Sequence, residues 1–237
     1  IFQYQNENNI NIFSSLVLGG ILTEQTDFLA LVDAQTNIIA NNGVQRKGVK
    51  YNPHRLISSA IASGKQIISS ESISYDELVR EDSRVVRLLT QNTKIDPNSN
   101  PNFLARYIIT PVKAENRKIL GALVSREIAK PALVERVNEI LKHGYSAIYL
   151  AETSGQFSLA LAQEKLDDGT VNSNAKLTDT SLLEKAIETK GETVSQWIKL
   201  KDVNYAMSAK ALLNFNGQPI AVLVRGVCLN EINSLIS

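Results

Sequence analysis

The chain has 237 residues, of which 43% are hydrophobic and 21% are charged, and 25 basic against 24 acidic side chains leave a net charge of +1. This composition excludes a disordered chain, and the balanced charge argues against a nucleic-acid surface, which needs clustered positive charge. No apolar run approaches the roughly 20 residues that cross a bilayer. The length allows one large core or two modest ones.

The chain is expected to open with a helix within residues 1–26. Apolar residues recur there at helical spacing, at Ile10, Phe13, Val17 and Ile21. Such a helix could pack along the sheets or against a second chain, and a simple core helix of one domain is an equally consistent interpretation.

Two strands and a short helix are predicted next. Residues 28–41 read as strand, acidic turn and strand. Asn52 can cap a helix that has Pro53 in its first turn and ends at Gly64. A third strand is expected at residues 67–68. The helix stripe consists of Leu56, Ile57, Ala60 and Ile61.

An insertion follows the first helix, because the segment from Gly64 to Ala105 is much longer than its later counterpart from Gly191 to Tyr205. It contains a predicted helix, residues 75–91. Two interpretations stay open. Acidic side chains could pair with arginines along a solvated face, or the arginines could bind an anionic group of a ligand bidentately together with Tyr75. The acidic residues are Asp76, Glu77 and Glu81, and the arginines are Arg80, Arg84 and Arg87.

A hairpin at residues 105–124 closes the first half. Strand alternation places Arg106 and Thr110 on one face and Tyr107 on the other. If the two hairpin strands pair so that the numbers of opposed residues add up to about 231, Gly121 and Ser125 lie on the same face of the sheet as Arg106. Because a buried unpaired arginine is costly, Arg106 is expected to reach Glu127, solvent or a ligand carboxylate.

The second half repeats this plan after a connecting helix at residues 131–144. Residues 147–162 read again as strand, acidic turn and strand, and a helix capped by Asp179 or Thr180 ends near Gly191. A strand at residues 194–198 leads to a hairpin, residues 205–224, that aligns without a gap with residues 105–124. Residues 229–237 look like the start of a helix that leads towards a membrane segment, so we expect a piece of a longer protein.

Catalytic and metal-binding motifs are absent from the sequence. His54 and His143 have no partner at metal-ligand spacing, and no glycine-rich phosphate loop or nucleophile elbow is present. A single cysteine, Cys228, excludes an internal disulfide. We therefore expect no enzyme, no cofactor and no metal.

Four segments carry a resemblance to a known family: "LALVDAQTNIIANN", "FLARYIITPVKAENRKILGALV", "GYSAIYLAETSGQF" and "YAMSAKALLNFNGQPIAVLVRG". In this order the chain resembles the double Cache sensor domains of bacterial transmembrane receptors, and the last two segments look like those of cyanobacterial chemotaxis receptors. The resemblance implies an α+β fold with two tandem PAS-like modules, each an antiparallel sheet flanked by helices.

The resemblance also implies a domain plan and a function. It predicts an N-terminal helix (residues 1–26), a membrane-distal module (27–130), a linker helix with a membrane-proximal module (131–228) and the start of a C-terminal helix (229–237). The distal module would bind a small molecule, in a periplasmic part of an inner membrane protein that dimerises. The candidate ligand-binding residues are Tyr75, Arg84, Arg87, Arg106, Tyr107, Thr110 and Ser125.

One family feature is missing, and several alternatives follow. Amino-acid-sensing members carry an Arg-x-Trp-Tyr signature, whereas Val85, Val86 and Arg87 follow Arg84 here.

The output domain could belong to a chemotaxis receptor, a histidine kinase or a nucleotide cyclase. A ligand-free protein-interaction module is the second hypothesis, and it predicts a first-module cavity filled by the chain's own side chains.

Overall fold

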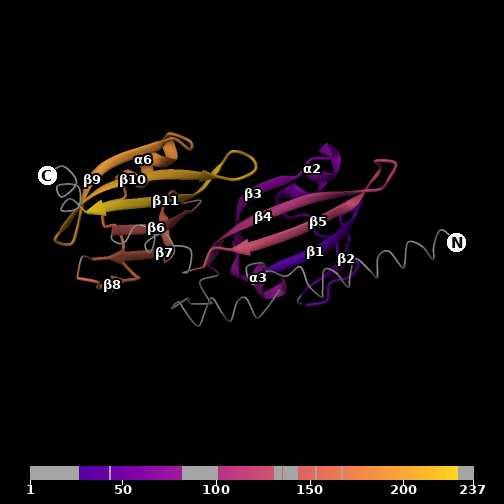
Figure 1. Cartoon of the computed structure of the whole chain (residues 1–237), viewed down its shortest axis with the longest axis horizontal. Coiled ribbons are helices and arrows are strands. Elements are labelled where there is room, and N and C mark those ends of the chain that lie inside the picture. Colours follow the sequence, from indigo (N-terminus) through magenta and orange to yellow (C-terminus); the bar gives the residue numbers. More distant parts are fainter. Residues whose placement is uncertain are drawn as a thin grey trace. The chain divides into compact units, whose positions relative to one another are not determined.

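The computed structural model describes residues 27–42, 44–81, 101–130, 135, 144–152, 154–166 and 168–228. These residues form an α+β fold with two antiparallel sheets (Figure 1). The chain divides into two compact units between Ile128 and Ala129. The helices predicted within residues 1–26, 131–143 and 229–237 lie outside the described residues, apart from Glu135, which is helical.

The first unit is a five-stranded sheet in the order β2-β1-β5-β4-β3. Its elements along the chain are β1 (Phe28–Asp33), β2 (Ile38–Asn41), the 3-10 turn η1 (Pro53–Arg55), α2 (Leu56–Ser63), β3 (Ile67–Ser74), α3 (Tyr75–Glu81), β4 (Asn102–Lys113) and β5 (Ile119–Ile128). The predicted insertion helix is described only as α3, and its continuation beyond Glu81 lies outside the described residues.

The second unit is a six-stranded sheet in the order β8-β7-β6-β11-β10-β9. Its elements are β6 (Gly144–Ala151), β7 (Phe157–Lys165), β8 (Val171–Asn172), α6 (Ser181–Glu188), β9 (Thr193–Leu200), β10 (Val203–Leu213) and β11 (Pro219–Cys228). Apart from β8, the strand order repeats that of the first unit. The short strand β8 has no counterpart in the first unit, and its residues Val171 and Asn172 pair with β7.

Each central helix forms where the sequence predicts it. Asn52 Oδ1 accepts hydrogen bonds from the amides of Ile57 and Ser58, both at 3.1 Å, so Asn52 holds the start of α2, although Arg55 and not Asn52 directly precedes this helix. The helix α2 then ends at Gly64, whose φ of 64° is the left-handed conformation that glycine adopts without cost. Both α2 and α6 cover their sheets with buried apolar side chains. These are Leu56, Ile57 and Ala60 in α2, and Leu182, Leu183 and Ala186 in α6.

The two closing hairpins confirm the duplication. The β4–β5 pairing begins at Ala105 with Ile128, and the β10–β11 pairing begins at Tyr205 with Cys228, so each partner is displaced by one hundred positions. The predicted strand register, in which opposed residue numbers add up to about 231, was wrong by two residues, because Arg106 pairs with Glu127 rather than Ser125. A shift of two residues leaves every side chain on its predicted face, since strand side chains alternate with period two.

The turn of the second hairpin gives a first testable prediction. Asn214 Oδ1 accepts hydrogen bonds from the amides of Asn216 and Gln218, at 3.0 and 2.9 Å. Asn214→Ala should therefore lower the free energy of unfolding by about 1 kcal/mol. The first unit provides the matched control, because Ala114 holds the equivalent place there and already lacks these bonds. A urea titration that finds no loss would contradict the role given to the Asn214 side chain.

Candidate functional site: a buried ionic cluster in the first unit

One row of side chains crosses the first sheet and brings a guanidinium, two aromatic rings and a hydroxyl side by side. Arg126 in β5 is paired with Phe28 in β1 and with Tyr107 in β4, and Tyr107 is paired in turn with Ser69 in β3. Directly opposed residues of antiparallel strands project to the same face. This face is the core face, since Phe28, Tyr107 and Arg126 are all 0% exposed.

Arg126 is held in this row by stacking and by charge. Its guanidinium lies 5.1 Å from the centre of the Phe28 ring. Its Nη1 forms an ion pair with Glu81 Oε2 at the end of α3, and the other Glu81 oxygen lies 3.5 Å from Arg46 Nη1. Glu81 is only 1% exposed. Arg46, Glu81 and Arg126 therefore form a triad with two positive charges and one negative charge.

Part of the Arg126 guanidinium has no hydrogen-bond partner of good geometry among the described residues, namely Nε and Nη2. The hydroxyls of Tyr51 and Tyr107 hydrogen-bond to each other. Buried polar groups in folded proteins are nearly always paired, and each unpaired one costs about 1–3 kcal/mol. Two unpaired guanidinium nitrogens in the core are a feature that packing alone does not explain.

The two phenols are kept protonated by their surroundings. Burial raises the pKa of Tyr51 to about 12, although the nearby Arg126 charge acts in the opposite direction. Burial also raises the pKa of Tyr107 well above its ordinary value, and the neighbouring Tyr51 adds to this. Burial lowers the pKa of Arg126, but a guanidinium starts so high that it stays charged. At neutral pH the cluster therefore presents hydroxyl and guanidinium donors.

The raised pKa of Tyr51 gives a second prediction. A phenol that ionises near 10.0 when unfolded and near 12 when folded contributes stability that is complete below pH 10.0 and is lost as pH rises towards 12. Tyr51→Phe should make the decline of the urea midpoint over this range shallower, because one of the phenols responsible is removed. An unchanged slope in the variant would mean that Tyr51 ionises normally in the folded chain.

Further charged groups surround the cluster and have their own partners. Asp27 Oδ2 accepts a hydrogen bond of 2.7 Å from the Ile128 amide. Glu71, 1% exposed, accepts a hydrogen bond of 2.6 Å from the Ser69 hydroxyl and lies 3.6 Å from His54 Nδ1. His54 has a φ of 47°, in the left-handed region that is unfavourable for a non-glycine residue. The strained backbone before α2 thus sets His54 beside Glu71.

The sheet divides the residues predicted from the sequence between its faces. Tyr107 lies in the buried cluster, and Tyr75 packs partly buried against the same core. Arg106, Thr110 and Ser125 project from the opposite face, where Arg106 is exposed. Arg84 and Arg87 lie outside the described residues. Among the described candidates, Tyr107 is therefore separated from Arg106, Thr110 and Ser125.

Glu81 requires a correction. One interpretation of the insertion placed it on a solvated face, paired with Arg80 or Arg84. In the structure Glu81 is buried and pairs with Arg126 and Arg46. The reason is that Leu78 and Glu81, three residues apart, both lie on the inward face of α3.

The sequence analysis missed Arg126, Tyr51 and Arg46. A signal for Arg126 is present, because it follows Ala122 and Val124 in the inward phase of β5, where a charge is unusual. Tyr51 and Arg46 lie in the irregular segment between β2 and η1. No periodicity marks their direction there.

The second unit has a glycine where the first unit has Arg126. The position that corresponds to Arg126 is Gly226, which is paired with Met207 and Tyr145. A Cβ atom there would lie 3.1 Å from Met207 Cγ, 3.2 Å from Tyr145 Cβ and 3.3 Å from Tyr205 Cδ1. The neighbouring side chains therefore occupy the space that Arg126 takes in the first unit.

The tyrosines of the second unit also have partners. The hydroxyls of Tyr145 and Tyr149 lie 2.8 Å apart, and Tyr145 donates to the carbonyl oxygen of Ala175 at 3.0 Å. Tyr149 accepts a hydrogen bond of 2.7 Å from the Leu177 amide. Tyr205 donates to Glu164 Oε1 at 3.0 Å. This polar network is closed by the chain itself, in contrast to the donors around Arg126.

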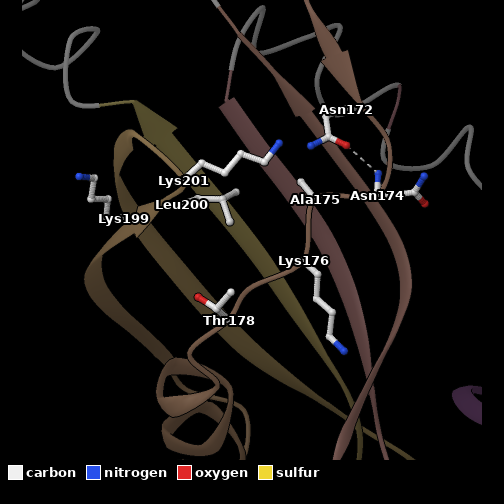
Figure 2. A pocket seen from close by; sticks show the side chains of 8 residues that line it. All are labelled: Asn172, Asn174, Ala175, Lys176, Thr178, Lys199, Leu200 and Lys201. Atoms are coloured by element: carbon white, nitrogen blue, oxygen red, sulfur yellow. Dashed lines mark hydrogen bonds between the residues drawn. The ribbon is translucent and has the colours of Figure 1, made fainter.

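The second unit does carry an open surface pocket of about 600 Å³ between the segment before α6 and the β9–β10 turn. Figure 2 shows Lys201 reaching towards Asn172 and Asn174, while Lys199 points away. Its lining residues are Asn172, Asn174, Ala175, Lys176, Thr178, Lys199, Leu200 and Lys201. The lysines are exposed, so the pocket offers solvated charges and no buried donor.

The described residues show neither a metal-binding group nor a membrane-spanning helix. They contain no group of three or more histidine, cysteine, aspartate or glutamate residues arranged to hold a metal ion. None of the helices within the described ranges has the length and apolar character needed to cross a membrane.

Comparison with known proteins adds structural matches. No protein-family profile and no curated protein matches the chain. Solved structures match over most of its length, among them the ligand-binding domain of the Pseudomonas aeruginosa amino-acid chemoreceptor PctC in complex with GABA, at 10% identity and a TM-score of 0.43, covering 95% of this chain and 89% of that one. These are receptor domains.

Two further matches are of the same kind. The ligand-binding domain of the Pseudomonas fluorescens chemoreceptor CtaA, in complex with L-serine, is 12% identical, with a TM-score of 0.45 and coverage of 92% and 79%. The sensor domain of the Vibrio cholerae histidine kinase DctB is 13% identical, with a TM-score of 0.43 and coverage of 94% and 81%. The expected likeness to sensor domains is thus found in structure, whereas a cyanobacterial origin is not supported. At such identities and TM-scores the likeness describes the fold and does not define a function.

Proposed function

We propose that the chain is the extracytoplasmic sensing domain of a transmembrane receptor, and that a small molecule binds in the first unit at the cluster around Arg126. Each unit would be a PAS-like Cache module, with the first, residues 27–130, distal to the membrane and the second, residues 131–228, proximal to it. The receptor would be an inner membrane protein, with its membrane segments outside this sequence and a dimer as its working form.

The unpaired donors of the first unit carry the proposal. The two units share one strand order but differ in the equivalent row of the sheet. The second unit places Gly226 between Met207 and Tyr145, and the Tyr145 hydroxyl has partners. The first places Arg126 between Phe28 and Tyr107, with donors that have none among the described residues. A bound molecule would supply the missing acceptors and recover the cost of their burial.

A methyl-accepting chemotaxis receptor is the output we favour for such a domain, and a histidine kinase or a nucleotide cyclase is the alternative. Binding would shift the relative positions of the terminal segments, and the receptor would pass that shift across the membrane. In either case the reaction chemistry would lie outside this chain, which we propose acts only by binding.

A thermal-shift screen tests the proposal. Amino acids, carboxylates, amines and purines are added to the purified chain, and a ligand that binds the folded state should raise the melting temperature progressively once its concentration exceeds its dissociation constant. Tyr107→Phe should weaken that response, and the matched control Tyr149→Phe in the second unit should leave it unchanged. A response that follows Tyr149 rather than Tyr107 would contradict a site in the first unit.

A ligand-free interaction module remains the second candidate. One observation favours it, namely that Glu81, a side chain of the chain itself, already pairs with Arg126. This is the kind of internal filling expected of a degenerate pocket. A screen in which none of the compounds moves the melting temperature would support this candidate over the first.

A further inference from the structure

The guanidinium of Arg126 has an open edge, and this edge indicates the class of ligand. Its ion pair with Glu81 is formed at Nη1. Nε and Nη2, which have no partner among the described residues, form the other edge of the planar group. The two N–H bonds of such an edge run parallel and match the two oxygens of a carboxylate.

We propose that the ligand of the first unit carries a carboxylate that binds bidentately to Nε and Nη2 of Arg126, while Glu81 stays on Nη1. This inference rests on the function proposed above. The hydroxyls of Tyr51 and Tyr107 hydrogen-bond to each other, and the phenol proton that this pair leaves free would donate a further hydrogen bond to the same group. A carboxylate accepts at several lone-pair sites, so it can serve the edge and the phenols together.

The charge of Arg126 is balanced by acids of the chain itself. Glu81 forms the ion pair at Nη1, and the negative charges of Asp27 and Glu77 also act on Arg126, while Arg46 adds a like charge. A ligand carboxylate would therefore be held by the hydrogen-bonding edge of Arg126 and not by an excess of positive charge.

The site is covered by α3, whose described part runs from Tyr75 to Glu81 and contributes Leu78 and Glu81 to the buried face. Because these contacts come from α3 and not from the strands, a ligand could enter by displacing them without disrupting the sheet that carries Arg126 and Tyr107.

Short carboxylates and their amides make the sharpest probes. Acetate and propionate are compared with acetamide and propionamide at equal ionic strength, with sodium chloride as the salt control, by calorimetric titration and thermal unfolding. The carboxylates should bind and raise the melting temperature, whereas the amides should not. Equal behaviour of acid and amide would overturn the inference.

Variants of the cluster give the second arm. Arg126→Lys keeps the charge opposite Glu81 but removes the parallel edge, so carboxylate affinity should fall about ten- to a hundredfold. Tyr107→Phe should reduce it severalfold, and it also serves if Arg126→Lys does not fold. Glu81→Gln should bind propionate at least as tightly as the native chain, because one competing carboxylate is gone. Undiminished binding by both Arg126→Lys and Tyr107→Phe would contradict the assignment.

The failure of this inference can be told apart from that of the function. If the screen yields a ligand without an anionic group, and if its binding depends on Tyr107 but not on Arg126, the sensing function stands and the carboxylate assignment fails. If neither the screen nor the probes produce binding, both are wrong.

Discussion

Arg126→Met is expected to lower the free energy of unfolding of the first unit by about 3–5 kcal/mol. The substitution removes the main partner of Glu81, which is 1% exposed and would retain only Arg46, with an N–O distance of 3.5 Å. An uncompensated charge in the interior costs more than the lost packing of a guanidinium on Phe28. The loss can be measured by urea denaturation and by native-state hydrogen exchange of the β4 and β5 amides.

The double variant Arg126→Met with Glu81→Gln is the matched control for this prediction. It removes both charges, so it should recover most of the loss, because replacing both members of a buried ion pair is far less harmful than replacing one. A loss below about 1 kcal/mol for Arg126→Met alone would mean that Glu81 is solvated in the folded chain.

Tyr145→Ala should lower the free energy of unfolding of the second unit by a similar 3–5 kcal/mol. Tyr145 is 0% exposed and lies beside Gly226, where its ring occupies the place that corresponds to Phe28. Its removal opens a cavity in the second core and leaves Tyr149 and the Ala175 carbonyl without their shared partner. Hydrogen exchange of the β6, β10 and β11 amides would report the loss.

Tyr145→Phe separates packing from hydrogen bonding. It keeps the ring and removes only the hydroxyl, so its cost should be about 1–3 kcal/mol. If Tyr145→Ala costs no more than Tyr145→Phe, the ring does not fill the second core as described. The pair of variants therefore tests whether the second unit is closed by its own side chains.

The duplicated fold could be predicted from the sequence because the pattern is local. The closing hairpins align position by position, so their strand pairing repeats at the same offset. Side chains close to the start of each central helix accept hydrogen bonds from backbone amides there, Asn52 Oδ1 from Ile57 and Asp179 Oδ1 from Ser181. Such features depend on neighbours along the chain, which a single sequence displays directly.

The cluster could be predicted only in part, because it depends on contacts between distant segments. Tyr107 was identified from its strand, and strand alternation placed it on the face opposite to Arg106, as the structure has it. Extending the hairpin alignment by two residues would have set Arg126 against Gly226 and marked it as unusual. The pairing of Glu81 with Arg126 joins residues 45 positions apart in the chain, and helix periodicity does not indicate it.

Hydrogen exchange with and without a ligand from the screen tests the central claim, that the first unit and not the second holds the ligand. The account predicts added protection in α3, β4 and β5, around Glu81, Tyr107 and Arg126. Protection confined to β6, β10 and β11 would contradict it.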